Sequence, residues 1–256
     1  MESLPNGVKT RTIRIPTYDG QEIDAFVAEP TAPGRHPGIS FGMEAMGLNI
    51  FNRKVAVDMA AQGYVCVMPD YYRGGTPSQP DNYDDFTEVH AAITKLDFTK
   101  GTHDVMAGLD WLRSRRNVDA RRLVTWGYCT GGTLSWLAAA LDRELAACVL
   151  FFPSQPRFDE RTPKRPVSPV DMIWNIACPT IIHYGGQDKV MQPEHQADLR
   201  QRIAQWNAPV ELVMYPEAGH AFSAVRSPTK YNKGASDRSW ATTLGFLKTQ
   251  LAKRAA

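Results

Sequence analysis

The feature that most constrains the fold of this 256-residue chain is the alternation of short apolar runs with segments of helical character. The runs are rich in β-branched and aromatic residues, as buried strands are. They lie at residues 38–41, 64–68, 123–126, 147–152, 180–184 and 211–215. The candidate helices lie at residues 51–62, 103–114, 132–141, 194–206 and 239–252. This order predicts an α/β protein whose mostly parallel central sheet carries helices on both faces.

A hairpin and two long loops complete the expected architecture. The turn signal Asp19-Gly20 lies between two strand candidates and predicts an antiparallel hairpin at the edge of the sheet. A high frequency of glycine, proline or aspartate in two segments predicts two loops over one end of the sheet. The hairpin strands are expected at residues 11–16 and 22–28, and the loops at residues 73–85 and 154–170. Because the sequence shows no repeat and no low-complexity segment, we expect one domain over residues 1–256.

Charge and composition argue against several classes of function. Lys and Arg number 29 against 27 Asp and Glu, and this net charge of +2 does not favour nucleic acid or an anionic membrane as partner. No stretch approaches the roughly 18 apolar residues of a membrane span, and residues 1–16 lack the apolar run of a secretory signal. The four cysteines are widely spaced, so we expect free thiols, no bound metal and a cytoplasmic location.

The most informative motif is Gly127-Tyr128-Cys129-Thr130-Gly131, which follows an apolar strand and precedes a helical run. A tight strand-to-helix turn strains its central residue, and glycines two positions away on either side avoid collisions there. The central side chain then lies at a helix N-terminus, where the dipole and free N–H groups favour a thiolate and an oxyanion. The motif predicts that Cys129 is a nucleophile; a buried core cysteine beside an ordinary turn is the alternative.

Two later strands offer partners for this thiol. Asp188 follows one apolar strand after a Gly-Gly turn, and His220 lies in the loop after the next strand. Parallel strands bring such residues to one carboxyl edge of the sheet, and the chain order of nucleophile, acid and histidine is that of hydrolases with this turn. Nucleophilic catalysis needs a base and an acceptor that orients the base. We therefore expect His220 to be the base and Asp188 its partner, although a loop histidine and a turn-forming aspartate are the alternatives for each alone.

These segments resemble the dienelactone hydrolase (carboxymethylenebutenolidase) family, and the resemblance covers nearly the whole chain. The cysteine in the turn is specific, because most α/β-hydrolases use serine there. The matching pieces are FGMEAMGLN (41–49), QGYVCVMPD (62–70), GYCTGG (127–132), GGQD (185–188) and EAGHAF (217–222). The resemblance implies an α/β-hydrolase fold and a cysteine-dependent hydrolase of a small-molecule ester or lactone that needs no cofactor. It leaves the oligomeric state open between a monomer and a small homo-oligomer.

The resemblance also assigns roles around the three residues named above. Glu44 is similar to a family glutamate that contacts the resting thiol and is displaced when substrate arrives. The backbone N–H groups of Ala45 and Thr130 are the implied oxyanion hole, and the N–H of Thr130 follows from the turn geometry as well. The implied reaction is attack by thiolate, formation of a thioester, and its hydrolysis by water that His220 activates. A loop carboxylate without catalytic role is the alternative for Glu44.

The match departs from the family where the family binds a substrate carboxylate with two arginines. Ala224 occupies the position four residues after His220, where the family has one arginine, and Phe86 and His90 stand where it has an arginine and a tyrosine. The candidates for a rebuilt anion site are Arg73, His90, Lys95 and Arg226. The candidates for an apolar substrate pocket are Tyr83, Phe86, Phe152, Phe158, Trp174 and Phe222.

The prediction is therefore a cysteine-dependent hydrolase of an ester or lactone. A broad-specificity carboxylesterase or thioesterase acting on neutral esters is the first alternative. A non-catalytic ligand-binding protein with the hydrolase fold is the second, and a redox-sensing thiol protein is the third. Loss of turnover on removal of the Cys129 thiol separates the enzymes from the binding protein, and oxidation by peroxide without ester turnover identifies the sensor.

Overall fold

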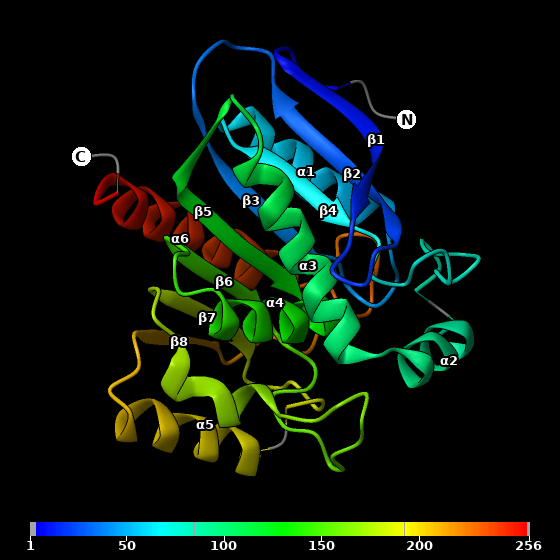
Figure 1. Cartoon of the computed structure of the whole chain (residues 1–256). Helices are drawn as coiled ribbons and strands as arrows, with labels where there is room; N and C mark the ends of the chain where they lie inside the picture. The colour runs from blue at the N-terminus through cyan, green and yellow to red at the C-terminus, as the bar shows by residue number, and fades with distance from the viewer. Residues whose placement is uncertain (1–3, 84, 192, 255–256) are drawn as a thin grey trace.

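The computed structural model describes residues 4–83, 85–191 and 193–254 (Figure 1). Its strands are β1 (Val8–Pro16), β2 (Glu22–Pro30), β3 (His36–Gly42), β4 (Val65–Pro69), β5 (Val118–Tyr128), β6 (Ala147–Phe151), β7 (Thr180–Gly185) and β8 (Val210–Tyr215). Its helices are α1 (Ile50–Ala61), α2 (Thr87–Lys95), α3 (Phe98–Arg113), α4 (Cys129–Leu141), α5 (Pro193–Gln205) and α6 (Lys233–Ala252), with a 3₁₀ helix η1 (Pro169–Asn175).

All eight strands form one sheet, in the order β1-β2-β4-β3-β5-β6-β7-β8. The pairs β1–β2 and β2–β4 are antiparallel, and the remaining neighbours are parallel. The helices α3 and α4 pack on one face of this sheet, and α1 and α6 pack on the other (Figure 1). The predicted α/β-hydrolase architecture with its N-terminal antiparallel hairpin is therefore confirmed.

Several elements begin earlier than the apolar pattern predicts, because polar residues cap them. Asp97 accepts a hydrogen bond of 3.0 Å from the N–H of Lys100, so α3 starts five residues before the predicted 103. Asn232 caps α6 in the same way through the N–H of Ala235, at 3.0 Å. The predicted loop 154–170 runs into η1 at its end, where Pro169 is tolerated because it occupies the first turn.

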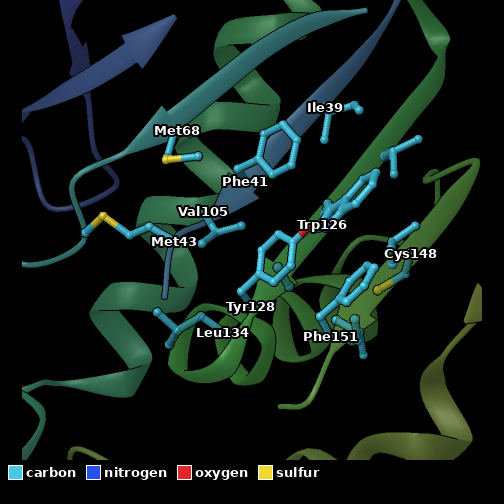
Figure 2. Close-up of a cluster of buried hydrophobic side chains, with 14 of the residues drawn as sticks. Ile39, Phe41, Met43, Met68, Val105, Trp126, Tyr128, Leu134, Cys148 and Phe151 are labelled. Atoms are coloured by element: carbon cyan, nitrogen blue, oxygen red, sulfur yellow. The ribbon is translucent and has the colours of Figure 1, made fainter. Parts of the chain in front are cut away.

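The centre of the core is a row of aromatic side chains from three neighbouring strands (Figure 2). The ring centroids of Phe41 and Trp126 lie 5.5 Å apart, and those of Trp126 and Phe151 lie 5.7 Å apart. Each of the three side chains is at most 1% exposed. Trp126 also contacts Trp240 of α6, at 5.7 Å between ring centroids. Burial of one such side chain contributes about 1.5–3 kcal/mol. This row fixes the relative position of β3 and β5, whose carboxyl ends carry the candidate site.

Three further features of the described residues concern membrane-spanning helices, metal-binding groups and the state of the cysteines. Over the described ranges, no helix combines the length and the apolar character needed to cross a membrane. The same part of the chain holds no group of three or more His, Cys, Asp or Glu side chains placed to bind a metal ion. All four cysteines are free thiols, and Cys66, Cys148 and Cys178 are buried.

Candidate active site

Three side chains that the sequence predicts as a catalytic set meet at the carboxyl edge of the sheet. Cys129 follows β5, Asp188 follows β7 and His220 follows β8. The Nε2 atom of His220 lies 3.2 Å from the Sγ atom of Cys129, and its Nδ1 atom lies 2.8 Å from Oδ2 of Asp188. The imidazole thus bridges the thiol and the carboxylate, which is the arrangement that an activated nucleophile requires.

The turn that presents Cys129 depends on three glycines. Cys129 has a φ of +50°, a left-handed conformation that is strained for any residue with a side chain. A Cβ atom on Gly127 would lie 2.2 Å from the carbonyl oxygen of Gly131, and one on Gly131 would lie 2.2 Å from the carbonyl group of Gly42. The glycines therefore allow β3, β5 and the start of α4 to touch. Gly42 lies outside the predicted motif, because its partner comes from another strand.

Asp188 is oriented by backbone groups of its own turn. Its side chain is fully buried, and Oδ1 accepts hydrogen bonds from the N–H groups of Val190 and Met191, at 2.8 and 3.3 Å. These two donors leave Oδ2 directed at the Nδ1–H of His220. The carboxylate is therefore held in place on one oxygen and orients the imidazole with the other.

Close contact between two loops brings the acid to the histidine. The N–H of Gln187 donates to the carbonyl oxygen of Ala218, at 2.8 Å, two residues before His220. A Cβ atom on Gly185 would lie 2.4 Å from that same oxygen, and one on Gly186 would lie 2.7 Å from Cα of Pro216. The Gly-Gly pair is thus more than a turn signal, because side chains there would push the two loops apart.

The electrostatic surroundings favour the thiolate form of Cys129. Burial alone raises the pKa of a thiol, as it does for Cys66 and Cys148. At Cys129 the charge of His220 and its hydrogen bond, together with the hydroxyl of Ser154, outweigh burial and lower the pKa of the thiol. The thiolate therefore forms at a lower pH than it does in an ordinary cysteine.

The pKa of His220 shifts in the direction opposite to that of Cys129. Burial disfavours its charged form, but the neighbouring thiolate and the hydrogen bonds to Asp188 and Cys129 outweigh burial and raise the pKa of His220. The rings of Phe152 and His220 pack edge to face, with 5.2 Å between their centroids, and this contact supports the imidazole sterically. Both shifts favour a thiolate–imidazolium pair over a neutral thiol and a neutral imidazole.

The rate at which iodoacetamide alkylates Cys129 is expected to show this pairing. The rate rises with pH as the thiol ionises, and we expect the pH midpoint of this rise to lie below the ordinary thiol pKa of about 8.5. The reason is that a lowered pKa leaves the thiolate present at lower pH. In His220→Gln we expect the midpoint to rise above that value, because burial then acts without the imidazolium. Mass spectrometry of the Cys129 peptide across pH measures both rates, and the buried Cys66 serves as an unreactive internal control. The same midpoint in both proteins would contradict the pairing.

Two tyrosines hold the segment after β3 that carries the predicted oxyanion donor Ala45. The hydroxyl of Tyr71 lies 3.0 and 3.2 Å from the carbonyl oxygens of Met43 and Glu44. The hydroxyl of Tyr72 donates to the carbonyl oxygen of Ala45, at 2.9 Å. These bonds fix the peptide planes around Ala45. The second predicted donor, the N–H of Thr130, belongs to the first turn of α4, where amides have no partner within the helix.

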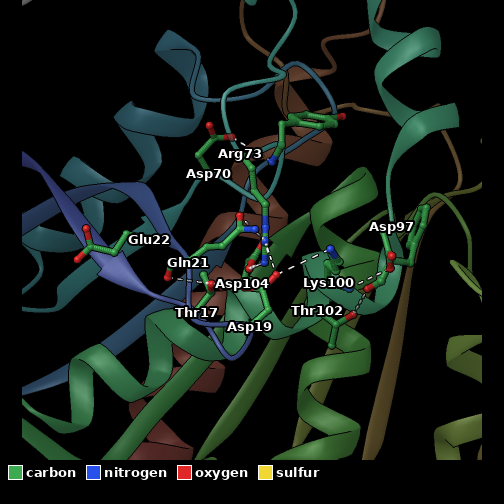
Figure 3. Close-up of polar contacts among 12 residues, drawn as sticks. Thr17, Asp19, Gln21, Glu22, Asp70, Arg73, Asp97, Lys100, Thr102 and Asp104 are labelled. Carbon is green, nitrogen blue, oxygen red and sulfur yellow. Dashed lines mark hydrogen bonds and ion pairs between the residues drawn. The ribbon is translucent and has the colours of Figure 1, made fainter.

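An ion-pair cluster anchors the turn directly after these tyrosines (Figure 3). The Arg73 guanidinium donates to both carboxylate oxygens of Asp104, at 2.9 and 2.7 Å, and to Asp19, at 2.7 Å. Arg73 has a φ of +53°, and the cluster holds this strained conformation in place. Arg73, which the sequence offers as an anion-binding residue, is therefore engaged in positioning its own turn.

Glu44 lies at the site but its hydrogen bonds go elsewhere than expected. Its buried carboxyl accepts from the amide of Asn49, at 2.8 Å, and from the hydroxyl of Tyr83. The thiol of Cys129 contacts His220 instead of the carboxyl group to which the resemblance assigns it. Burial raises the pKa of Glu44 despite its two donors. In its ionised form Glu44 raises the pKa of the thiol, so its influence on Cys129 is electrostatic.

Ser154 is a site residue that sequence reasoning missed. Its N–H donates to the carbonyl oxygen of Cys129, at 3.1 Å, and its hydroxyl lies 3.5 Å from that of Thr130. It also lines a cleft of about 940 Å³ whose walls are formed by the proline-rich loop, including Phe158 and Arg165. Cys129 itself does not line this cleft, so Ser154 is the residue that connects the cleft with the turn of the thiol. Nothing in the local sequence distinguishes this serine from other loop serines.

The structure moves two predicted substrate-binding residues away from the site. Phe222 is fully buried and packs against Phe152 and Tyr215, with 5.2 Å between ring centroids in each pair. It therefore belongs to the core, since its side chain faces inward from the loop of His220. Trp174 lies on η1, is 55% exposed, and does not line the cleft beside Ser154.

The remaining candidates lie at α2 and in the loop after His220. His90 is exposed on α2, and Arg226 is exposed in the loop after His220. Phe86 is half-buried, and the ammonium group of Lys230 lies 3.8 Å from the centroid of its ring. Of these predicted residues, Phe86 is thus the one whose ring contacts a lysine.

Comparison with known proteins points to one family. Residues 23–251 match the model of the Dienelactone hydrolase family. A Salmonella typhimurium protein named "Putative carboxymethylenebutenolidase" is 31% identical, covering 93% of this chain and 87% of the relative. A Bradyrhizobium protein named "Probable 2-oxo-3-(5-oxofuran-2-ylidene)propanoate lactonase" is 30% identical, covering 94% of this chain and 97% of its own. The crystal structure of a "Putative Dienelactone Hydrolase" from Klebsiella pneumoniae superposes with a TM-score of 0.85 at 28% identity, covering 95% of this chain and 99% of that one.

Proposed function

Because this chain belongs to the dienelactone hydrolase family and is a hydrolase of esters or lactones, we propose that it works through a Cys129-His220-Asp188 triad and a thioester intermediate. The observation that carries this proposal is the single imidazole that contacts both the thiol and the buried carboxylate, at 3.2 and 2.8 Å. The lowered pKa of the thiol and the raised pKa of the histidine support it, because they favour the reactive thiolate.

The first half of the reaction forms the thioester. The Sγ atom of Cys129 attacks the carbonyl carbon, and the electron pair of the C=O bond moves to oxygen. The N–H groups of Thr130 and Ala45 stabilise this oxyanion; loss of one such donor typically costs ~10²–10³ in rate. The C=O bond re-forms as the ester C–O bond breaks. The imidazolium of His220 gives its Nε2 proton to the leaving alkoxide or enolate.

The second half of the reaction releases the acid and restores the thiol. Water donates a proton to Nε2 of His220 as its oxygen attacks the thioester carbonyl carbon. The tetrahedral intermediate expels the Cys129 thiolate, which returns to its contact with the imidazolium. Asp188 keeps the Nδ1–H of the imidazole oriented through both halves. In a lactone the leaving oxygen stays tethered to the acyl group, so a single hydroxy or oxo acid is released.

We assign Glu44 a tuning role in this scheme. Its ionised carboxylate disfavours the neighbouring thiolate, and its protonated form removes that repulsion. Burial favours the protonated form, and the donors Tyr83 and Asn49 favour the ionised one. A change in either contact when substrate binds therefore alters how readily Cys129 ionises.

A neutral aryl ester tests the intermediate directly. Mixing the protein with 4-nitrophenyl acetate is expected to release a burst of nitrophenol equal to the protein present, followed by slower turnover. Protein quenched during the burst is expected to carry one acetyl group on the Cys129 peptide. The buried thiol Cys178 serves as the internal control and is expected to stay unmodified. Turnover with the acetyl group on another residue would refute the thioester mechanism, and absence of all turnover would favour a binding protein.

We also infer the compartment and the domain structure, each from one further observation. All four cysteines are free thiols, which supports a reducing, cytoplasmic location. The family match spans residues 23–251, and all strands share one sheet, which supports a single domain. A single cooperative unfolding transition in urea tests the second inference, and the redox state of the cysteines in freshly lysed cells tests the first.

A further inference from the structure

Asn52 is a fully buried amide on α1 that takes no part in the mechanism above. Its Oδ1 atom accepts a hydrogen bond from the N–H of Glu44, at 3.2 Å. Its Nδ2 atom donates to the carbonyl oxygen of Gly47, at 2.8 Å, and to Oδ1 of Asn49, at 3.0 Å. One side chain of α1 therefore binds both ends of the turn formed by residues 44–47.

This turn carries Ala45, whose N–H is one of the two predicted oxyanion donors. Ala45 is buried, and buried backbone N–H groups are almost always paired. Among the described residues, however, the N–H of Ala45 has no acceptor. An N–H group that is kept unpaired inside the protein is free to bind the oxyanion of a tetrahedral intermediate.

Contact between backbones places the start of this turn against the helix of the nucleophile. A Cβ atom on Gly131 would lie 2.2 Å from the carbonyl oxygens of Gly42 and Met43. Gly131 belongs to the first turn of α4, which begins with Cys129. The chain thus leaves β3 in contact with the helix that presents the thiol. The course of the next two residues decides where the N–H of Ala45 points.

The direction of the Ala45 N–H is set by the peptide plane that it shares with the carbonyl group of Glu44. This peptide bond is trans and planar, so the N–H points away from that carbonyl oxygen. The oxygen accepts from the N–H of Gly47, at 3.0 Å, and lies 3.2 Å from the hydroxyl of Tyr71. Asn52 binds both Glu44 and Gly47, so it holds the two residues that the first of these bonds joins.

We propose that Asn52 is a positioning residue that orients the N–H of Ala45 toward the oxyanion and thereby controls the rate of both tetrahedral steps. The inference rests on the proposed function, because it concerns the oxyanion hole of the same reaction. An amide suits this role because it offers an acceptor and two donors in one plane. It can therefore bind an N–H group and a carbonyl group of the same turn at once.

A positioning role differs measurably from a role in the fold or in thiol activation. Iodoacetamide reacts with the thiolate by loss of iodide from a saturated carbon, so no tetrahedral oxyanion forms in that reaction. Ester hydrolysis uses the same thiolate and forms an oxyanion in both halves. If Asn52 supported only the fold or the thiolate, its removal would slow both reactions. The ratio of the hydrolysis rate to the alkylation rate is therefore the deciding quantity.

The test replaces Asn52 by leucine, which has a similar branched shape and no polar atom. With 4-nitrophenyl acetate we expect the burst rate and kcat to fall by about 10–100-fold, because the donor is displaced rather than removed. KM is expected to change little, since the oxyanion forms only after the substrate has bound. The rate and the pH midpoint of Cys129 alkylation are expected to stay the same.

Asn175→Leu is the matched control, because Asn175 is another amide that joins two segments. Its Nδ2 atom donates to the carbonyl oxygen of Ala140, at 2.6 Å, and its Oδ1 atom accepts from Arg143, at 2.7 Å. These contacts lie at the end of α4 that is distant from Cys129. Asn175→Leu is therefore expected to leave the ratio of hydrolysis to alkylation unchanged, even if it lowers the unfolding temperature.

The outcomes separate this inference from the function on which it rests. Equal slowing of hydrolysis and alkylation in Asn52→Leu would overturn the positioning role, and so would an unchanged rate of hydrolysis. A loss of hydrolysis through KM alone would overturn it as well. If Asn52→Leu does not fold, Asn52→Ala, whose short side chain leaves room for water, is judged by the same criteria. Absence of ester turnover in the wild-type protein would overturn the proposed function together with this inference.

Discussion

Replacement of Cys129 by alanine is expected to lower kcat for ester hydrolysis by on the order of 10⁴-fold or more, as loss of the nucleophile does in other hydrolases. Without Sγ no thioester forms, and His220 loses the group whose proton it accepts. The oxyanion donors and the binding surfaces still act on the substrate, so a small residual rate above that of water is expected. Steady-state hydrolysis of 4-nitrophenyl acetate measures this loss.

The shape of the turn is expected to survive this substitution. Alanine at a φ of +50° carries a strain similar to that of cysteine, because both have a Cβ atom. The thermal unfolding temperatures of the two proteins are therefore expected to agree within a few degrees, and this agreement is the control. Cys129→Ser tests the chemistry further, because its hydroxyl does not ionise near neutral pH and should support only slow turnover. Substantial activity in Cys129→Ala would refute the assignment of the nucleophile.

The meeting of Cys129, Asp188 and His220 was predictable because each residue depends on short-range features of the sequence. Cys129, Asp188 and His220 each follow a strand that can be recognised from its apolar residues. From β5 to β8 the order of the strands in the sheet is their order along the chain, so the loops after them lie side by side. Parallel strands then deliver all three side chains to the same edge. No knowledge of long-range contacts was needed for this step.

The boundaries of elements were less predictable, for reasons that particular residues illustrate. The apolar pattern alone missed the first turns of α3 and α6, because capping by Asp97 and Asn232 sets where they begin. The helix α2 is nine residues long and buries Val89 alone, so packing against the core contributes little to where it begins and ends. Tertiary packing and capping decide where these elements begin and end. Hydrophobic periodicity in the sequence does not reveal either of these contacts.

The groups around the triad depend on contacts between distant segments. Tyr72, in the turn after β4, donates a hydrogen bond to the carbonyl oxygen of Ala45. Ser154, in the proline-rich loop, donates one to the carbonyl oxygen of Cys129. Lys230 contacts the ring of Phe86, although the two residues lie far apart in the chain and neither belongs to a recognisable motif. Such pairs follow from the register of the whole sheet and the paths of its loops. A single sequence carries no local pattern from which these contacts can be predicted.

Proximity in sequence also misled the search for a substrate pocket. Phe222 is one of the aromatic candidates for the pocket and lies two residues after His220, yet its ring points into the core. The left-handed backbone of Ala221, with a φ of +58°, changes the direction of the chain between His220 and Phe222. Side-chain direction after such a residue cannot be inferred from the alternation rule for strands.

Asp188→Asn is expected to lower kcat by about 10⁴-fold while leaving the fold intact, as the corresponding change does in serine hydrolases. The native carboxylate accepts on both oxygens: Oδ1 from the N–H groups of Val190 and Met191, and Oδ2 from His220. Asparagine has one oxygen, and the two backbone donors hold it. Its NH₂ group then faces Nδ1 of the imidazole. This contact favours the tautomer with its proton on Nε2, so the nitrogen that faces Cys129 can no longer accept a proton.

Two measurements separate this tautomer effect from a general loss of structure. In Asp188→Asn the midpoint of Cys129 alkylation is expected to rise, because the imidazolium has lost the charge that helps to raise its pKa. Asp237→Asn, at an exposed aspartate on α6, is the matched control and is expected to change neither kcat nor the midpoint. If Asp188→Asn lowers kcat and leaves the alkylation midpoint in place, Asp188 acts without orienting His220. The catalytic set then reduces to the thiol and the imidazole, with the carboxylate serving only to join the loops after β7 and β8.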